Sequence, residues 1–353
     1  MTSPLIITRA DPLLDELLRL SAAAGVTPEV AADPGGALRS WSAAPLVLVG
    51  LDVAAELADL GPPRRGGVHV VGLGAVPDEV FRVAVRLGAE NVAELPRSDQ
   101  WLLELLADAG ERAVRDAVTI GVVGGSGGSG ATTFACALAV VAARRGPACL
   151  VDADPQGPGV DQVLGFDRVD GVRWDALQQT TGRLSARALH DALPRRRQLG
   201  VLTWSTGPHG PLPAFAAREA MSAAVRGHDV VVVDLPRAAD PVTEELAARC
   251  RHLVVVARAT IPGYASAARL VSRVSASGPV GVVVRGAGVD ERDAASVLGA
   301  AVLTTMGDQR GLDESVDLGL GPLRSRRSVL GRAAARVLAS LHDGGAAAGG
   351  TAA

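Results

Sequence analysis

Hydrophobic residues in the first hundred positions alternate between two patterns. Some stretches are continuously apolar, as in buried strands, whereas others repeat apolar residues at helical spacing. The strand-like stretches are 5–8, 44–52, 67–74 and 91–96, and the helix-like stretches are 11–25 and 77–89. This alternation predicts a small parallel α/β sheet in a domain spanning 1–110, and a helix at 101–116 is expected to lead into a second domain.

A second alternation begins at Val118 and continues almost to the end of the chain. Its apolar runs, rich in valine and leucine, suit strands that helices bury on both faces. These runs are 118–125, 148–155, 199–205, 229–236, 252–259, 280–286 and 300–306. We expect a larger, doubly wound and mostly parallel sheet in a domain spanning 111–342. The segment 343–353 is too small and polar to pack, so we expect it to be disordered.

The composition fits two soluble α/β domains. A chain of 353 residues exceeds the usual single-domain size, and 48% hydrophobic residues can form sizeable cores. No apolar run approaches the roughly 18 to 20 residues of a membrane-spanning helix, and the first residues lack the regions of a signal peptide. We therefore expect a cytoplasmic protein. Cys136, Cys149 and Cys250 are widely spaced, which favours small buried residues over zinc ligands or disulfides.

Charge restricts both the partners and the chemistry. The net charge of −3 argues against a nucleic-acid partner on electrostatic grounds. The arginine runs within 195–197 and 324–327 could contact nucleic acid or acidic lipid, but solvated surface arginines are the simpler interpretation because no aromatic residues are interleaved. Lysine does not occur, so all 35 positions counted as lysine or arginine are arginines. No site in this chain can use an ammonium side chain.

A glycine-rich turn stands between the apolar run at 118–124 and a helix-like run that begins near Ala131. Successive backbone N–H groups of such a turn can converge on phosphate oxygens, and the start of the helix adds its positive dipole end. Against the pattern GxxxxGK[ST], Gly125, Gly130 and Thr132 fit, whereas Ala131 stands where lysine belongs. A flexible strand-to-helix turn without a ligand would have a similar sequence.

Carboxylates end two of the later apolar runs. Asp152 and Asp154 lie at the end of one run, and Asp234 ends another. The carboxyl ends of parallel strands border the ligand crevice of open α/β sheets. Acidic groups there can hold magnesium through water or orient an attacking water. An aspartate at a strand end is individually common, so the prediction of a phosphate site depends on the combination of loop and carboxylates.

With these features, residues 117–342 resemble the MinD/ParA family of deviant Walker ATPases, whose loop reads KGGxGK[ST][ST]. The aligned residues are Ser126, Gly127, Gly128, Ser129, Gly130, Ala131, Thr132 and Thr133. Both family lysines are therefore replaced, by Ser126 and Ala131. The resemblance implies ATP or ADP with Mg²⁺ as cofactor, held by the loop from Gly125 to Thr133.

The same resemblance assigns roles to residues outside the loop. It implies that Thr132 binds Mg²⁺, and that Asp152 and Asp234 contribute to the metal site, partly through water. Asp154 would place the hydrolytic water if the protein is active, and Arg285 would lie beside the adenine. It also implies a homodimer as the active form of such ATPases.

Residues 1–110 resemble the atypical receiver domain of CpaE and TadZ proteins, which has a flavodoxin-like (CheY-like) fold. A phosphorylatable receiver ends its third strand with an aspartate and carries a lysine before the proline after its fifth. Here Gly50 lies near the acceptor position and Leu95 replaces the lysine. Asp52 is offset from the acceptor position and is interpreted as a surface aspartate. Phosphorelay chemistry is not expected.

Within the CpaE-like set, the stretches 171–177 and 182–204 most resemble proteins described as septum-site-determining. This similarity implies a regulator of septum placement and cell division, recruited to the septum or pole. Its implied partners are cell-division proteins. A TadZ-like factor that localises type IV pilus assembly, with pilus-assembly partners, is an alternative.

The missing lysines affect binding less than hydrolysis. A charged hydrogen bond is worth roughly 1.5 to 3 kcal/mol, so losing one lysine weakens nucleotide affinity by about one to two powers of ten. Phosphoryl transfer depends more strongly on positive charge against the transferring group. We expect weak nucleotide binding with little or no turnover, unless an arginine from elsewhere takes the role. An active MinD-type ATPase that switches between monomer and dimer is the alternative.

An apolar stripe marks the last helix-like run, and arginines stand beside it. Its members are Val329, Leu330, Ala333, Val337, Leu338 and Leu341. A membrane-contacting helix is one interpretation. We favour a helix that covers the domain core, as most such stripes do. Trp174, Trp204 and Tyr264 are likewise expected to be packing residues.

Overall fold

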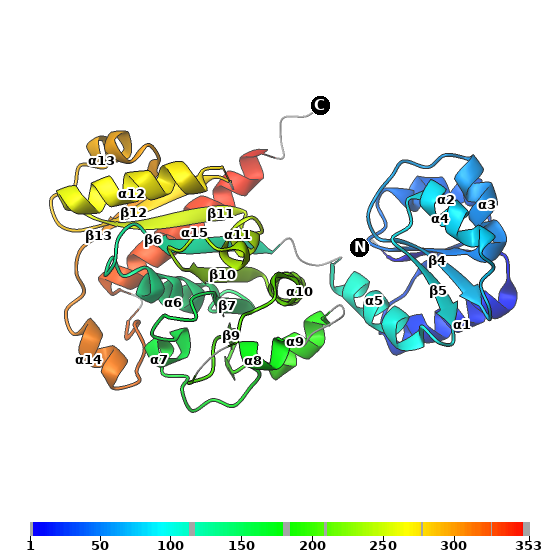
Figure 1. Ribbon diagram of the computed structural model, residues 1–353, viewed down its shortest axis with the longest axis horizontal. Coiled ribbons are helices and arrows are strands. Elements are labelled where there is room, and N and C mark those ends of the chain that lie inside the picture. The colour runs from blue at the N-terminus through cyan, green and yellow to red at the C-terminus, as the bar shows by residue number, and fades with distance from the viewer. Residues whose placement is uncertain are drawn as a thin grey trace. The chain divides into compact units, whose positions relative to one another are not determined.

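The computed structural model describes residues 3–112, 117–178, 184–207, 210–276, 278–325 and 327–348. The chain divides into two compact units, Met1–Asp116 and Ala117–Ala353. Figure 1 shows a sheet with helices in each unit. Among the described residues, no helix has the length and apolar character needed to cross a membrane.

The N-terminal unit is a parallel five-stranded sheet with strand order β2-β1-β3-β4-β5. Its strands are β1 (Leu5–Ile7), β2 (Glu29–Ala31), β3 (Val47–Gly50), β4 (Val68–Leu73) and β5 (Asn91–Leu95). Its helices are α1 (Asp11–Ala23), α2 (Pro34–Trp41), α3 (Leu51–Asp59), α4 (Glu79–Leu87) and α5 (Asp99–Arg112). This strand order is that of flavodoxin-like doubly wound sheets, as the sequence predicted.

The C-terminal unit contains an eight-stranded sheet with the order β13-β12-β11-β6-β10-β7-β9-β8. Its strands are β6 (Val118–Gly124), β7 (Ala148–Asp152), β8 (Arg195–Arg196), β9 (Leu199–Leu202), β10 (Val230–Leu235), β11 (His252–Arg258), β12 (Val280–Arg285) and β13 (Ala301–Met306). All neighbouring pairs are parallel except β8 and β9, which are antiparallel. The two-residue edge strand β8 was not predicted, because so short a strand leaves no period in the sequence.

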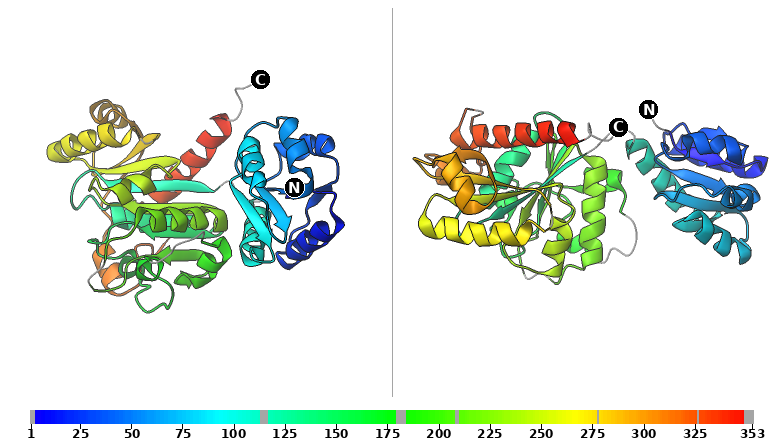
Figure 2. Two further views of the ribbon diagram at one scale, coloured as in Figure 1. Left: turned by 45° about the vertical axis from the view of Figure 1, so that its right-hand side comes forward. Right: turned by 90° about the horizontal axis from the view of Figure 1, so that it is seen from above.

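Helices cover both faces of this sheet, which explains the continuous valine runs of its strands. Figure 2 shows α15 and α12 on opposite sides of the sheet. The helices are α6 (Ala131–Ala142), α7 (Val160–Leu164), α8 (Trp174–Leu177), α9 (Ala186–Ala192), α10 (Ala214–Gly227), α11 (Pro241–Ala247), α12 (Ile261–Val274), α13 (Glu291–Leu298), α14 (Leu312–Asp317) and α15 (Val329–Ala348). One core packs beneath α10, α11, α12 and α13, and the other packs beneath α6, α7 and α15.

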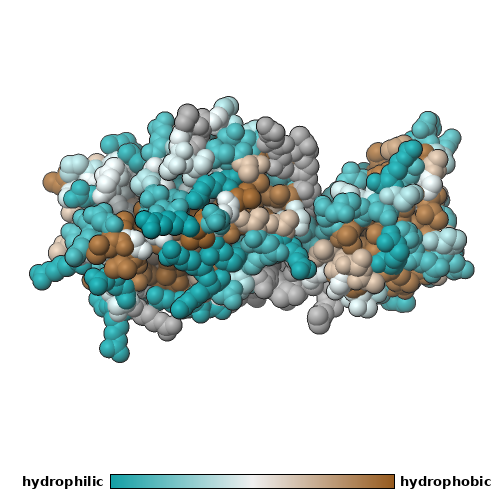
Figure 3. Space-filling view, turned by 90° about the horizontal axis from the view of Figure 1, so that it is seen from below, coloured by the Kyte–Doolittle hydropathy of each residue, from teal (hydrophilic) through white to brown (hydrophobic). Residues whose placement is uncertain are grey.

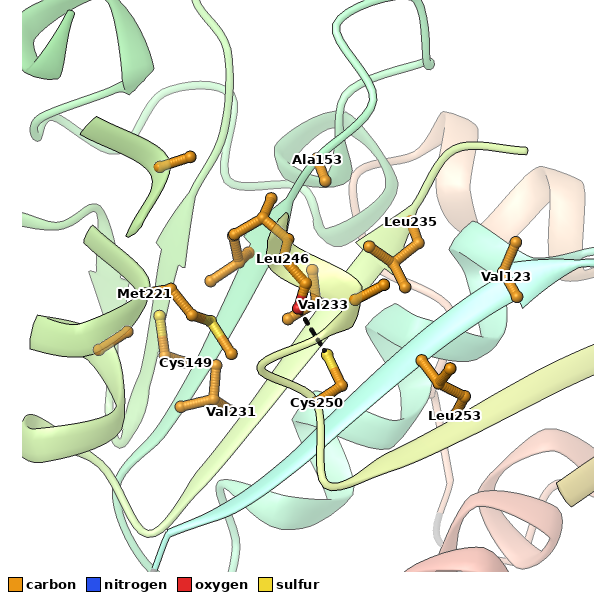
Figure 4. Packing of buried hydrophobic residues seen from close by; sticks show 14 of the residues in the cluster. Val123, Cys149, Ala153, Met221, Val231, Val233, Leu235, Leu246, Cys250 and Leu253 are labelled. Atoms are coloured by element: carbon orange, nitrogen blue, oxygen red, sulfur yellow. Dashed lines mark hydrogen bonds between the residues drawn. The ribbon is translucent and has the colours of Figure 1, made fainter. Parts of the chain in front are cut away.

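The first of these cores contains two of the three cysteines. Figure 4 shows Cys149 and Cys250 among the side chains around β10, with the thiol of Cys250 donating to the backbone oxygen of Leu246 at 3.3 Å. All three cysteines are free and buried, as the sequence predicted. Burial raises the pKa of both Cys149 and Cys250 to about 12, so neither is a ready thiolate.

The apolar stripe of the last helix belongs to the second core. Val337 and Leu338 are fully buried, and the rest of the stripe packs in the same cluster. The stripe therefore packs in the core of this unit.

On the face shown in Figure 3, apolar side chains form several patches separated by hydrophilic residues.

Two expected boundaries differ from those of the structure. Helix α5 runs to Arg112, across the expected limit at residue 110, and the two units divide between Asp116 and Ala117. Helix α15 extends to Ala348, into the segment 343–353 that we expected to be disordered. Residues 349–353 lie outside the described part of the chain.

Truncating the apolar stripe of α15 tests its place in the core. Leu338→Ala removes a fully buried side chain and should lower the free energy of unfolding by about 2 to 5 kcal/mol in a denaturant titration. Arg336→Ala, at an exposed position of the same helix, is the matched control and should stay within about 0.5 kcal/mol of wild type. Equal unfolding midpoints for the two variants would contradict the assignment of the stripe to the core.

Candidate nucleotide-binding site

The glycine-rich loop joins the end of β6 to the start of α6. The backbone N–H of Gly125 donates to the backbone oxygen of Val256 in β11 at 2.9 Å, which fixes the start of the loop. Gly128 and Gly130 have φ angles of +66° and +89°, which residues with a side chain rarely adopt. The loop therefore depends on glycine at these two positions.

The loop is open to solvent at Gly127 and Gly128. A Cβ atom added to Gly127 or Gly128 would meet nothing within 4 Å. No side chain caps the N-terminus of α6, so the first N–H groups of this helix are available to a ligand. An uncapped N-terminus beneath an open glycine loop suits an anion such as a phosphate.

Two buried aspartates lie beside this loop. β10 is hydrogen-bonded between β6 and β7, and Asp234 is the register partner of Asp152. Asp152 is 1% exposed and Asp234 is 4% exposed. The Thr132 side chain at the start of α6 is hydrogen-bonded to Asp234. The fold thus brings together the three predicted metal-site residues, Thr132, Asp152 and Asp234.

Burial raises the pKa of both aspartates. Desolvation raises the pKa of Asp234 to about 8, and the nearby Asp152 adds to the effect. Desolvation also raises the pKa of Asp152 to about 6, although Thr203 and two backbone N–H groups oppose the shift. Neither carboxylate forms an ion pair within the described chain, so a bound cation would relieve the cost of charging them.

Asp152 is held in place by several donors. Its Oδ2 accepts from the Thr203 hydroxyl at 2.8 Å and from the backbone N–H of Val160 at 3.2 Å. The indole N–H of Trp174 donates to the backbone oxygen of Asp152 at 2.7 Å. The sequence predicts Trp174 only as a packing residue and does not single out Thr203, because nothing along the chain indicates that either lies against β7. Both are positioning residues for Asp152.

Asp154 lies next to this pair and is partly exposed. Its backbone N–H donates to Oδ1 of Asp152 at 3.2 Å, and its own Oδ1 accepts from the backbone N–H of Gln156 at 3.0 Å. Within the described residues, the other carboxylate oxygen of Asp154 accepts no hydrogen bond from the protein, so it can accept one from a water. This arrangement is compatible with the water-placing role that the resemblance implied.

Arg285, at the end of β12, reaches the loop from the other side. Its Nη1 donates to the backbone oxygen of Ser129 at 3.4 Å, and a Cβ atom on Gly130 would lie 3.0 Å from this nitrogen. Its Nε donates to Asp308 at 2.6 Å, a partner that sequence analysis missed. Arg285 thus lies against the phosphate loop itself, and its expected contact with adenine stays a prediction.

These residues fit a magnesium nucleotide, although the lysines are missing. The described chain contains no group of three or more histidine, cysteine or acidic residues that could hold a metal alone. Mg²⁺ usually keeps several waters and takes oxygens from substrate phosphates, so one threonine and two carboxylates suffice. The buried carboxylates supply the negative charge, and the open helix N-terminus suits the phosphates.

In the N-terminal unit, Asp52 lies against the position where a phosphorylatable receiver carries its acceptor, which is Gly50 here. The carboxylate of Asp52 accepts from the Thr8 hydroxyl at 2.8 Å and from the backbone N–H of Arg9 at 2.6 Å. A Cβ atom at Gly50 would lie 2.3 Å from Oδ1 of Asp52. Asp52 therefore fills the space that a side chain at the acceptor position would need.

The raised pKa of Asp234 predicts how stability depends on pH. Its pKa rises from 3.8 to about 8 on folding, so its favourable contribution is fully present below pH 3.8 and is lost as pH rises to about 8. Asp234→Asn keeps an acceptor for Thr132 but does not ionise. Without nucleotide and with EDTA, this variant should match wild type near pH 4 and exceed its free energy of unfolding by a few kcal/mol at pH 8. A stability difference that is constant across this pH range would contradict the burial of a chargeable Asp234.

The sequence comparisons cover nearly the whole chain. Residues 7–117 match the family described as Rv3660c-like, CheY-like N-terminal domain. The protein Rv3660c of Mycobacterium tuberculosis strain H37Rv is 36% identical over 347 residues, covering 95% of this chain and 97% of the relative. The protein MT3760 of strain CDC 1551 matches with the same identity and coverage.

Solved structures resemble the C-terminal unit at the level of fold. MinD of Pyrococcus horikoshii in complex with Mg-ADP has a TM-score of 0.55 and 17% identity, covering 64% of this chain and 96% of its own. A ParA family ATPase of Chlorobium tepidum has a TM-score of 0.53 and 14% identity, covering 63% and 98%. A chain of the MinC:MinD cell division protein complex of Aquifex aeolicus has a TM-score of 0.52 and 18% identity, covering 63% of this chain and 96% of its own.

The sequence identity shows the family, and the structural similarity shows the fold of its second domain. The protein belongs to the Rv3660c family and combines a CheY-like N-terminal domain with a P-loop domain of the MinD/ParA fold.

Proposed function

We propose that this protein is a nucleotide-responsive regulator of septum placement and cell division. It binds ATP or ADP with Mg²⁺ weakly at the loop from Gly125 to Thr133 and hydrolyses ATP slowly or not at all. The nucleotide serves to select a conformation or an assembly that partner proteins recognise. The protein acts in the cytoplasm and is recruited to the septum or pole.

One observation supports nucleotide binding above all. The open glycine loop, the uncapped start of α6 and the buried pair Asp152 and Asp234 lie at the same edge of one sheet. A strand-to-helix turn without a ligand has no need for two unneutralised buried carboxylates, since each costs stability when charged. A magnesium nucleotide accounts for the loop and the carboxylates together.

The residues of this site are better suited to binding a magnesium nucleotide than to catalysing its hydrolysis. Thr132, Asp152 and Asp234 would hold the metal, directly or through water, and backbone N–H groups would hold the phosphates. When bound, Mg²⁺ supplies positive charge against the phosphates. Asp154 can orient a water, but Ala131 and Ser126 place a methyl group and a hydroxyl where the family has two cations. Hydrolysis therefore lacks much of the charge on which it depends.

Among the described residues hydrogen-bonded to the loop, Arg285 is the one whose positive charge could replace part of the charge of the missing lysines. Its side chain is 31% exposed, and its guanidinium donates to both the backbone oxygen of Ser129 and the carboxylate of Asp308. Asp308 is 78% exposed, so this ion pair is weak and can yield to a phosphate. We assign Arg285 to nucleotide binding.

Fold similarity supports the regulatory part of the proposal. The Pyrococcus horikoshii protein is a septum-site-determining MinD, and the Aquifex aeolicus MinD forms a complex with MinC. A switch protein of this fold needs a nucleotide-dependent surface more than a fast turnover. Cell-division proteins are therefore the proposed partners, and a homodimer is the proposed assembly.

Restoring the two lysines tests whether only these cations are missing. The variant Ser126→Lys/Ala131→Lys should bind ATP about tenfold to a hundredfold more tightly than wild type and should gain measurable hydrolysis. Adding Asp154→Ala should abolish the gained hydrolysis while leaving binding in place. Labelled-ATP saturation binding and a phosphate-release assay give both quantities. Wild-type turnover equal to that of the lysine variant, and lost with Asp154→Ala, would show instead that the protein is an active ATPase.

Two substitutions at one ion pair test the role of Arg285. Arg285→Gln should weaken nucleotide binding by about tenfold, whereas Asp308→Asn removes the competing carboxylate and should strengthen it a few-fold. The opposite signs separate a nucleotide contact from a general loss of structure. Unchanged affinity in both variants would exclude Arg285 from the site.

The cellular role is tested by the position of a fluorescent fusion. A septal signal that is lost in a Thr132→Val variant would support nucleotide-dependent septum placement. A signal confined to one pole together with the pilus apparatus would favour the TadZ-like alternative.

A further inference from the structure

A pocket lies at the opposite end of the sheet from the candidate nucleotide site. Two segments that have no part in the proposed function, within 196–199 and 320–323, contribute to its lining. Its volume is about 490 Å³. It is lined by Val140, Leu164, Phe166, Arg196, Arg197, Leu199, Leu320, Gly321, Pro322 and Leu323. Leu199 begins β9 and Val140 lies near the end of α6, so the pocket opens at the amino ends of the parallel strands. Apolar side chains form most of its wall.

Two arginines from one of the sequence's arginine runs border this pocket. The Arg196 guanidinium lies over the ring of Phe166, 4.8 Å from the ring centre, a cation–π contact that holds it at the pocket. Arg197 has a φ of +55°, so a strained backbone fixes the turn that carries it. Within the described chain, neither guanidinium forms an ion pair or a side-chain hydrogen bond. Their donors are available to an anionic partner.

Among the described residues, the backbone beside the pocket is paired on one side only. Arg196 belongs to β8, the edge strand of the eight-stranded sheet, which pairs on one side with β9. An edge strand presents unpaired N–H and C=O groups that can hydrogen-bond an extended peptide. An apolar pocket beside such an edge can hold one side chain of that peptide. Pocket and edge together favour a peptide over a small molecule.

The surrounding charges favour a discrete ligand over a membrane surface. Exposed carboxylates of Asp313, Glu314 and Asp317 belong to α14, which packs against α7 at the wall of the pocket. A flat anionic membrane would bring its charges close to these carboxylates as well as to the arginines. A narrow peptide can place its carboxylates on Arg196 and Arg197 alone.

We propose that this pocket, defined by Phe166, Arg196, Arg197 and Leu320, is a docking site for an acidic, extended peptide segment of a partner protein. One apolar side chain of the segment fills the pocket, and neighbouring glutamates or aspartates pair with the two arginines. The site is separate from the glycine loop and does not depend on nucleotide.

Binding of the full-length protein to arrays of immobilised peptides tests the proposal. The arrays vary a central residue between phenylalanine, leucine and serine, and vary its flanks between glutamate and lysine. The wild-type protein should bind peptides with an apolar centre and glutamate flanks at least about tenfold more tightly than either the serine-centred or the lysine-flanked peptides. Fluorescence anisotropy of the best peptides gives the affinities in solution.

Matched surface variants locate the binding site. Arg196→Glu/Arg197→Glu should lose binding by at least about tenfold and should shift the preference towards lysine flanks. Arg187→Glu/Arg292→Glu changes the charge equally at exposed positions outside the pocket and should bind as wild type does. Leu320→Asp should abolish the preference for an apolar centre, whereas Leu318→Asp, an exposed neighbour outside the lining, should not.

Three outcomes would overturn the proposal. The first is an array without preference for acidic, apolar-centred peptides. The second is an equal loss of binding in the pocket variants and in their controls. The third is binding to phosphatidylglycerol vesicles that requires Arg196 and Arg197 while no peptide binds, which would assign the pocket to a membrane surface. Because all substituted side chains are exposed or partly exposed, circular dichroism should show wild-type folding for each variant.

Discussion

The structure of the C-terminal unit is organised around two aspartates buried side by side. β10 lies between β6 and β7, and this order places Asp152 and Asp234 in register at the ends of their strands, next to the start of α6. Burying two carboxylates without a cation opposes folding, and their raised pKa values express this cost. The fold tolerates it because the parallel sheet and its two helical layers supply large apolar cores. A bound magnesium nucleotide would relieve it.

The chain keeps the parts of a phosphate site that belong to the backbone and lacks those that belong to lysine. Gly128 and Gly130 still hold the loop in conformations that only glycine adopts easily, and Thr132 still reaches Asp234. The two lysine positions carry a hydroxyl and a methyl group. Binding depends mainly on the first group of features, and rapid phosphoryl transfer depends on the second. The combination is therefore better suited to a switch than to an efficient enzyme.

The two ends of the sheet carry different kinds of surface, and α7 connects them. The backbone N–H of Val160, at the start of α7, donates to the carboxylate of Asp152. Leu164, at the end of α7, and Phe166 line the arginine-bordered pocket. A Cβ atom on Gly165 would lie 2.1 Å from the backbone oxygen of Gly319, so this end of α7 packs closely on the loop that completes the pocket. One short helix thus contacts both the candidate metal site and the proposed docking site.

The sequence by itself determined the two-domain α/β class, the glycine loop and the aspartates at strand ends. These features are local, since continuous valine runs, glycines and strand-end acids can be recognised without knowing what lies beside them. It could not reveal Thr203, Trp174 or Asp308, because each reaches its partner from a distant part of the chain. Nor could it bring Arg196 and Leu320 to one pocket. Strand order and packing decide which side chains meet, and both become visible only in the tertiary structure.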